Sequence, residues 1–170
     1  MGKIGSKEYK EIKYGAIPTV WNGVYFRSRL EARVACVLSM VGLRWDYEPF
    51  DLIGRYIPDF LVEMPFGPCL FECKPAILAH EFKEPCRRIT KSGWAGPALV
   101  IGSGLTQAPD NFVDLTLFGT THAEKGRWVQ VGRGRWPGDW GTYPFDDVWK
   151  NWAAAGTLTR WDPSRPTSNQ

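Results

Sequence analysis

Three acidic side chains and one lysine have the types and spacing that metal-assisted chemistry requires. Glu72 and Lys74 are separated by one residue, so in a strand both would project from the same face. Asp59 lies thirteen residues before Glu72. If the two segments form a hairpin, Asp59 lies beside Glu72, close enough to share a metal ion. Glu31 would join them if the helix that carries it packs across the sheet.

Adjacent carboxylates suit a hard divalent cation such as Mg²⁺ or Mn²⁺, which prefers oxygen ligands. Lys74 could orient or help to deprotonate a water on that cation, and the cation would stabilise charge developing on a phosphate. The residues therefore indicate hydrolysis of a phosphodiester. Each of these features taken alone has another interpretation. Glu31 could serve only as a helix cap, and Glu72 with Lys74 could form a solvated strand face.

A helix over residues 29–41 has the strongest local signal. Ser28 and Glu31 have the spacing of a capping box, in which each side chain satisfies a free amide of the other residue. Gly42 marks the C-terminal stop. An apolar stripe at helical spacing is predicted to face the core: Leu30, Val34, Val37, Leu38 and Val41.

Short strands surround the carboxylates in the sequence. The segments predicted as strands are 43–48, 55–62, 69–74 and 98–101. Pro58 cannot donate to a ladder and is expected at a strand start, an edge or a bulge. Residues 65–68 read as a turn, residues 76–91 as a helix, and the last strand is expected to end at Gly-Ser-Gly. This order indicates an α/β sandwich with a mixed sheet.

The chain beyond residue 104 has weaker signals, with a hairpin expected over 112–118 and 127–131 and a short helix over 146–155. Six of the nine tryptophans lie here: Trp128, Trp136, Trp140, Trp149, Trp152 and Trp161. We therefore divide the chain into a basic N-terminal arm (1–21), a core (22–103), a Trp-rich C-terminal extension packed on the core (104–162) and a disordered tail (163–170).

The ordered motifs resemble the PD-(D/E)xK nuclease superfamily, most closely a group that includes transposon-end endonuclease subunits and small phage or prophage endonucleases. That group has a Tyr-x-Ser-x-x-Glu-Ala helix start, then Tyr-Glu-Pro, Tyr-x-Pro-Asp-Phe and a Glu-x-Lys strand. The corresponding segments here are Phe26-Arg-Ser28-Arg-Leu-Glu31-Ala32, Tyr47-Glu-Pro49, Tyr56-Ile-Pro-Asp59-Phe60 and Glu72-Cys-Lys74. Phe26 replaces the usual tyrosine, and the resemblance covers roughly residues 22–102.

The resemblance implies a restriction-endonuclease-like core, a mixed sheet flanked by helices, that acts as a Mg²⁺- or Mn²⁺-dependent DNA endonuclease. Asp59 and Glu72 would bind the metal together with the backbone carbonyl of Cys73. Lys74 would position the attacking water. Glu31 would complete the acidic site or hold a metal-bound water.

DNA contacts are expected from basic residues in three places, although a net charge of +3 is too small to identify nucleic acid as a partner. The candidates are Arg27, Arg29 and Arg33 at the helix start, Lys10 and Lys13 in the arm, and Arg133 and Arg135 near the C-terminal tryptophans. A merely solvated arm and tryptophans that only pack a small subdomain remain alternatives.

Compartment and partners follow from simpler features. No apolar run is long enough to cross a bilayer, and the start lacks the pattern of a secretory signal. The four cysteines form no zinc module and are expected as buried free thiols, which indicates a reducing, cytoplasmic compartment: Cys36, Cys69, Cys73 and Cys86. Cutting both strands would need two sites, hence a homodimer or a partner subunit. A non-catalytic nucleic-acid-binding or inhibitor protein, or a phage assembly component, remains the alternative class.

Overall fold

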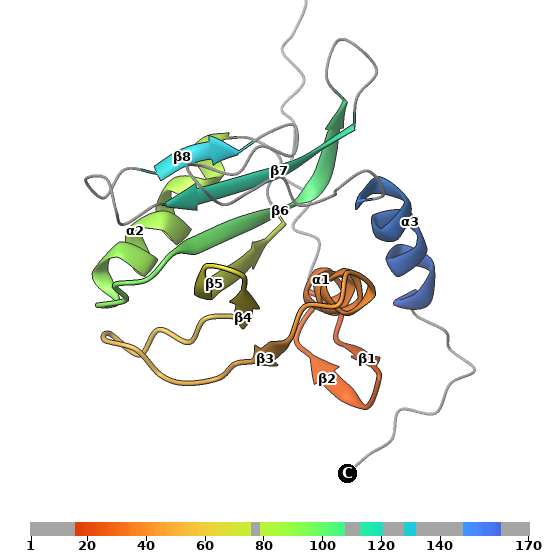
Figure 1. The fold of residues 1–170 in the computed structure, drawn as a ribbon, viewed down its shortest axis with the longest axis horizontal. Coiled ribbons are helices and arrows are strands. Elements are labelled where there is room, and N and C mark those ends of the chain that lie inside the picture. The colour runs from red at the N-terminus through yellow and green to blue at the C-terminus, as the bar shows by residue number, and fades with distance from the viewer. Residues whose placement is uncertain (1–15, 76–78, 108–112, 121–127, 132–147, 161–170) are drawn as a thin grey trace, which may run out of the picture.

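A six-stranded mixed sheet forms the centre of this computed structural model, which describes residues 16–75, 79–107, 113–120, 128–131 and 148–160 (Figure 1). Its strands lie in sequence order: β3 (Trp45–Tyr47), β4 (Phe60–Met64), β5 (Gly67–Lys74), β6 (Ala98–Gln107), β7 (Val113–Thr120) and β8 (Trp128–Val131). The β5–β6 pair is parallel and the other neighbours are antiparallel. The predicted α/β class with a mixed sheet is confirmed.

Helices cover both faces of this sheet. On one face, α1 (Arg29–Met40) packs its buried Val34 and Leu38 against Phe60 and Phe71. On the other face, α2 (Lys83–Lys91), preceded by a 3₁₀ turn (Ala79–Phe82), packs against the strands β5 and β6. A third helix, α3 (Val148–Leu158), lies beside α1 (Figure 1). A separate hairpin of β1 (Thr19–Trp21) and β2 (Val24–Phe26) leads into α1. Within the described residues, no helix combines the length and the apolar character needed to cross a membrane.

The strand β5 presents alternate residues to these two layers. Phe71 and Cys73 lie in the core beneath α1, whereas Leu70 lies in the core beneath α2. Glu72 lies two residues after Leu70, so its side chain points to the same face of the sheet, the one that α2 covers. This alternation places Glu72 on the α2 side of β5 and the core residues Phe71 and Cys73 on the α1 side.

Local signals predicted most elements but not all of their ends. The helix α1 ends one residue earlier than expected, and Gly42 follows it with φ of +75°. The strand β4 begins only at Phe60, because the preceding Gly54 and Arg55 adopt positive φ and Pro58 cannot donate to a ladder. The hairpin β7–β8 and the helix α3 are confirmed within a few residues.

One predicted strand end was wrong. We expected the strand over 98–101 to stop at Gly-Ser-Gly, but β6 continues to Gln107. Its pairing with β7 is irregular between Ile101 and Leu105, so the glycines mark a break in register rather than a turn. Residues 76–78, where the second predicted helix was expected to begin, and the tail 163–170 lie outside the described residues.

Candidate active site

The β4–β5 hairpin places two of the predicted carboxylates beside each other. Phe60 pairs with Phe71 in this antiparallel ladder, so the next position outward sets Asp59 opposite Glu72. Oδ2 of Asp59 accepts a hydrogen bond of 2.6 Å from the main-chain amide of Cys73. That contact fixes Asp59 against the strand that carries both Glu72 and Lys74.

Glu72 is buried and held at both carboxylate oxygens. The hydroxyl of Tyr56 donates to Oε2 at 2.6 Å, and the ammonium of Lys74 lies 2.7 Å from Oε1. The side chain of Glu72 is 4% exposed, whereas that of Lys74 is 31% exposed. The solvated strand face considered for this pair is therefore wrong for Glu72, and Lys74 connects a buried carboxylate to solvent.

Glu31 reaches this region from α1, on the other face of the sheet. Its carboxylate accepts from the hydroxyl of Ser28 at 2.7 Å, the hydroxyl of Tyr47 at 2.5 Å and the amide of Arg27 at 3.1 Å. Ser28 caps the amide of Glu31 at 3.2 Å, but the predicted reciprocal bond to the amide of Ser28 is replaced by these contacts. Glu31 is buried and so is more than a surface cap.

The carboxylates act on one another at the end of β5. Burial first, and then repulsion from Glu72, raises the pKa of Asp59 to about 7, while the amide of Cys73 and the charge of Lys74 partly oppose this rise. Glu31 adds to the rise in the pKa of Asp59. Glu72 and Glu31 thus both repel the charged form of Asp59, and a cation bound to Asp59 would favour that form.

The raised pKa of Asp59 predicts how the metal-free protein responds to pH. In the unfolded chain this carboxyl titrates near pH 4, so the folded protein holds the proton more tightly. Its contribution to stability is fully present below about pH 4 and is lost as the pH rises through about 7. Urea unfolding in EDTA should show this fall for wild type relative to Asp59→Asn, which cannot titrate. Parallel stability–pH curves for the two proteins would contradict the prediction.

Arg27 is the predicted DNA-binding residue that the structure brings to the site. Its Nε lies 2.6 Å from Glu48 and its Nη2 lies 3.2 Å from Oδ1 of Asp59. The side chain of Arg27 is 54% exposed and that of Asp59 is 5% exposed. A half-exposed guanidinium therefore contacts a buried carboxylate.

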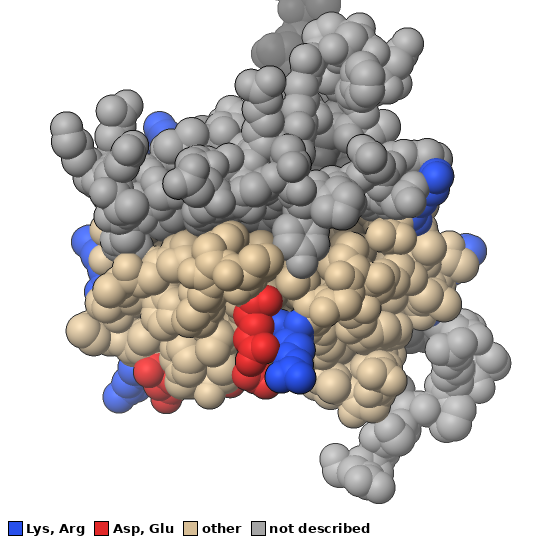
Figure 2. Space-filling model, in the orientation of Figure 1, with Lys and Arg blue, Asp and Glu red and all other residues tan. Residues whose placement is uncertain are grey.

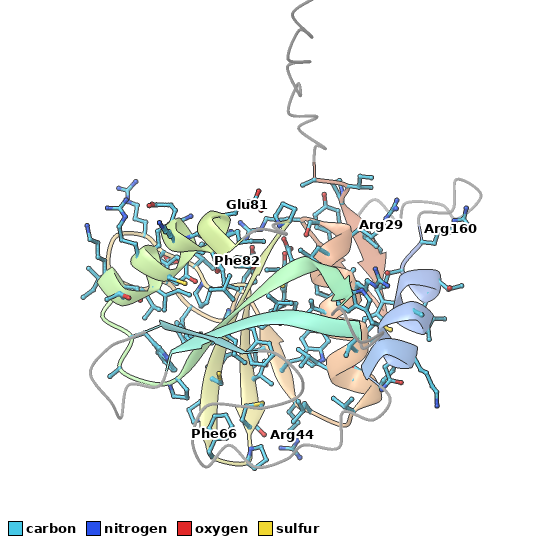
Figure 3. The ribbon with its side chains drawn as sticks, turned by 90° about the horizontal axis from the view of Figure 1, so that it is seen from above. Arg29, Arg44, Phe66, Glu81, Phe82 and Arg160 are labelled. Carbon is cyan, nitrogen blue, oxygen red and sulfur yellow. The ribbon has the colours of Figure 1, made fainter. Side chains whose placement is uncertain are left out.

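The other two predicted DNA contacts at the helix start, Arg33 and Arg29, have different surroundings. Nε and Nη2 of Arg33 donate to the carbonyl of Trp152 at 2.8 and 2.6 Å, and its guanidinium lies 4.0 Å above that ring. Arg33 thus ties α1 to α3 and is not oriented toward the carboxylates. Arg29 lies at the start of α1, and its buried Nε has no hydrogen-bond partner among the described atoms. Figure 3 places Arg29 and Arg160 toward the end of the molecule opposite Arg44 and Phe66.

The remaining DNA-contact candidates cannot be placed. Lys10, Lys13, Arg133 and Arg135 lie outside the described residues. On the face shown in Figure 2, the described Lys and Arg side chains are spread around the margin, with acidic and basic groups adjacent near the middle. That face therefore has no gathered basic patch within the described part.

Three residues that the chemical reasoning did not assign belong to this site. Tyr47 and Tyr56 each hold one carboxylate, and Glu48 holds Arg27. The available signal was their position within the quoted Tyr-Glu-Pro and Tyr-x-Pro-Asp-Phe segments. Tyrosine is not a charged residue type, so the spacing of charged side chains does not indicate that Tyr47 and Tyr56 orient the carboxylates.

The carboxylate oxygens of the site are ligands of the type that a hard cation prefers, but their present arrangement does not form a metal site. In the part of the chain that the structure describes, no group of three His, Cys, Asp or Glu side chains is set to hold a metal ion. Asp59 and Glu72 offer the carboxylate oxygens that Mg²⁺ prefers. Arg27 and the amide of Cys73 now contact Asp59, and Tyr56 and Lys74 contact Glu72. Binding would require at least one of these donors to move.

Comparisons with protein-family models, curated proteins and solved structures each found no match to this chain. The functional proposal therefore rests on the geometry of the site and on the order of its motifs.

Tyr56→Phe tests whether the hydroxyl of Tyr56 supports Glu72. The substitution leaves Oε2 of Glu72 buried without its 2.6 Å partner, so we expect the free energy of unfolding to fall by about 1–3 kcal/mol. Urea unfolding measures this loss. Tyr25→Phe is the matched control because Tyr25 is exposed, and its effect should stay within about 0.5 kcal/mol. Equal stability of the two variants would show that the hydroxyl of Tyr56 contributes nothing.

Proposed function

We propose that this chain is a Mg²⁺- or Mn²⁺-dependent DNA endonuclease of the PD-(D/E)xK type, built on a restriction-endonuclease-like core. One observation carries the proposal: Asp59, directly before β4, is bound to the amide of Cys73 on β5 and is repelled by Glu72, and the ammonium of Lys74 lies 2.7 Å from Glu72. Buried neighbouring carboxylates beside a partly exposed lysine are costly for a merely structural element. Their carboxylate oxygens suit a site that binds a cation once a protein donor moves away.

Each residue has a distinct role in this proposal. A divalent cation held by Asp59, Glu72 and the carbonyl of Cys73 would stabilise charge on the phosphate and acidify a water. Lys74 is anchored to Glu72 and reaches solvent, so its ammonium can orient the attacking water. Glu31 is fixed by Ser28 and Tyr47 and adds negative potential to the site.

A nuclease of this kind would also have a DNA partner, a defined assembly and a cellular location. The partner is DNA, and cutting of both strands would use a second copy of the chain or a partner subunit. The compartment is the cytoplasm, that of the host cell if a phage encodes the protein. The segment after residue 104 would contribute to the choice of DNA or partner.

A second candidate is a nucleic-acid-binding or inhibitor protein that keeps the fold without turnover. The observation that favours it is that protein donors contact both central carboxylates and that the described side chains form no three-ligand metal group. Calorimetric titration with Mn²⁺ separates the two. Heat of binding supports the nuclease, whereas retained DNA affinity without Mn²⁺ binding supports the second candidate.

Cleavage assays test the proposed function itself. Purified full-length protein is incubated with plasmid, branched and single-stranded DNA in Mg²⁺, in Mn²⁺ and in EDTA. We expect cleavage of at least one substrate with a divalent cation and none with EDTA. Intact DNA under every condition, or cleavage that EDTA does not affect, would contradict a metal-dependent nuclease.

A further inference from the structure

We propose that Arg27 is an exchangeable counter-ion: it holds Asp59 while no metal is bound, and it moves to a DNA phosphate when a divalent cation binds. This inference rests on the proposed function and adds a step to it. The guanidinium of Arg27 contacts Oδ1 of Asp59 and the amide of Cys73 contacts Oδ2, so a metal ion that binds Asp59 meets a positive charge already placed at this carboxylate. The two cations therefore compete for one carboxylate.

The contacts of Arg27 identify which part of it can move. Its main-chain amide lies 3.1 Å from both the carboxylate of Glu31 and the hydroxyl of Tyr47, so the backbone is fixed. Its guanidinium is half exposed and is held by two ion pairs of unequal length: 2.6 Å from Nε to Glu48 and 3.2 Å from Nη2 to Asp59. Rotation about the shorter contact would release Asp59 while the backbone stays in place.

The exposure of Arg27 and the chemistry of its guanidinium indicate a phosphate as its alternative partner. Asp59 is buried, and the half-exposed guanidinium of Arg27 contacts its Oδ1. An arginine beside a metal-binding carboxylate has the planar donor set that binds phosphate oxygens in pairs. The side chain of Arg27 would therefore contact Asp59 in the metal-free protein and a phosphate of the substrate in the metal-bound protein.

Metal affinity tests the exchange without relying on cleavage. Arg27→Gln removes the competing charge, so calorimetry with MnCl₂ should give a Kd about three- to tenfold lower than wild type. Arg44→Gln is the matched control, since Arg44 pairs loosely with Glu63 at 3.8 Å near the opposite end of the sheet (Figure 3). Its Kd should equal that of wild type. Arg27→Lys keeps the charge and should give an intermediate value, and thermal unfolding checks that each variant folds.

DNA affinity gives the second readout. Ca²⁺ or Mn²⁺ at a concentration that saturates the site should raise the affinity of wild type for a short duplex. This rise follows because binding of the metal and binding of DNA are coupled through Arg27, and the coupling is reciprocal. Arg27→Gln should therefore lose most of the rise. Unchanged or weaker Mn²⁺ binding by folded Arg27→Gln would overturn the exchange and leave the metal site standing. Absence of Mn²⁺ binding in wild type, Arg27→Gln and Arg27→Lys alike would overturn both the exchange and the proposed function.

Discussion

Asp59→Asn is expected to abolish Mg²⁺-dependent DNA cleavage, with a loss of at least about 10³-fold. The substitution removes one of two charged metal ligands, and a bound cation contributes several kcal/mol to stabilising the transition state, each 1.4 kcal/mol being about tenfold. The amide oxygen can still accept from the amide of Cys73, so the hairpin should remain intact. Initial rates on the best substrate, together with Mn²⁺ calorimetry, measure the effect.

The control for this variant comes from the same hairpin. Glu63 lies on β4 near the turn, with its side chain 68% exposed and only a loose ion pair to Arg44. Glu63→Gln also removes one negative charge and should leave both cleavage and Mn²⁺ binding unchanged. If Asp59→Asn cleaves DNA as fast as Glu63→Gln, Asp59 does not bind the catalytic metal.

Lys74→Met is expected to lower the single-turnover cleavage rate about 10²–10⁴-fold while Mn²⁺ binding persists. The ammonium orients or deprotonates the attacking water in the proposed reaction, and a positioned acid–base group contributes a factor of that size. Removing its contact at 2.7 Å also frees Oε1 of Glu72 for the metal. The Kd for Mn²⁺ should therefore be equal to or lower than that of wild type.

An exposed lysine on α2 provides the comparison. Lys91→Met changes the net charge by the same amount at the last residue of that helix and should cleave normally. Loss of Mn²⁺ binding together with cleavage in Lys74→Met would assign the lysine to holding Glu72 in place. Unimpaired cleavage would remove Lys74 from the mechanism.

The parts of this fold that were predictable depend on residues close in sequence. Ser28 and Gly42 mark the ends of α1 because helix caps act within one turn. The one-residue spacing of Glu72 and Lys74 determines their common side of β5, and the short turn before Gly67 makes the hairpin that brings Asp59 to them. Local geometry was enough for these three features.

The remaining features depend on contacts between distant segments. Arg33 lies at the helix start with Arg27, yet it binds Trp152, 119 positions away, which no local pattern indicates. Glu72 is buried with the hydroxyl of Tyr56 as a hydrogen-bond partner. The carboxylate of Asp59 accepts from Arg27, which lies 32 positions earlier in the sequence. Charge and spacing thus identified the carboxylates, whereas the donors that hold them required the folded chain.

A crystal structure of the protein soaked in MnCl₂ would test most directly whether Asp59 and Glu72 share one metal ion. We predict a single anomalous-scattering peak about 2.1 Å from a carboxylate oxygen of each residue, with Nη2 of Arg27 withdrawn from Asp59. The contradicting result is a protein without metal between these carboxylates at saturating Mn²⁺, in which Arg27 still contacts Asp59 and Lys74 still contacts Glu72.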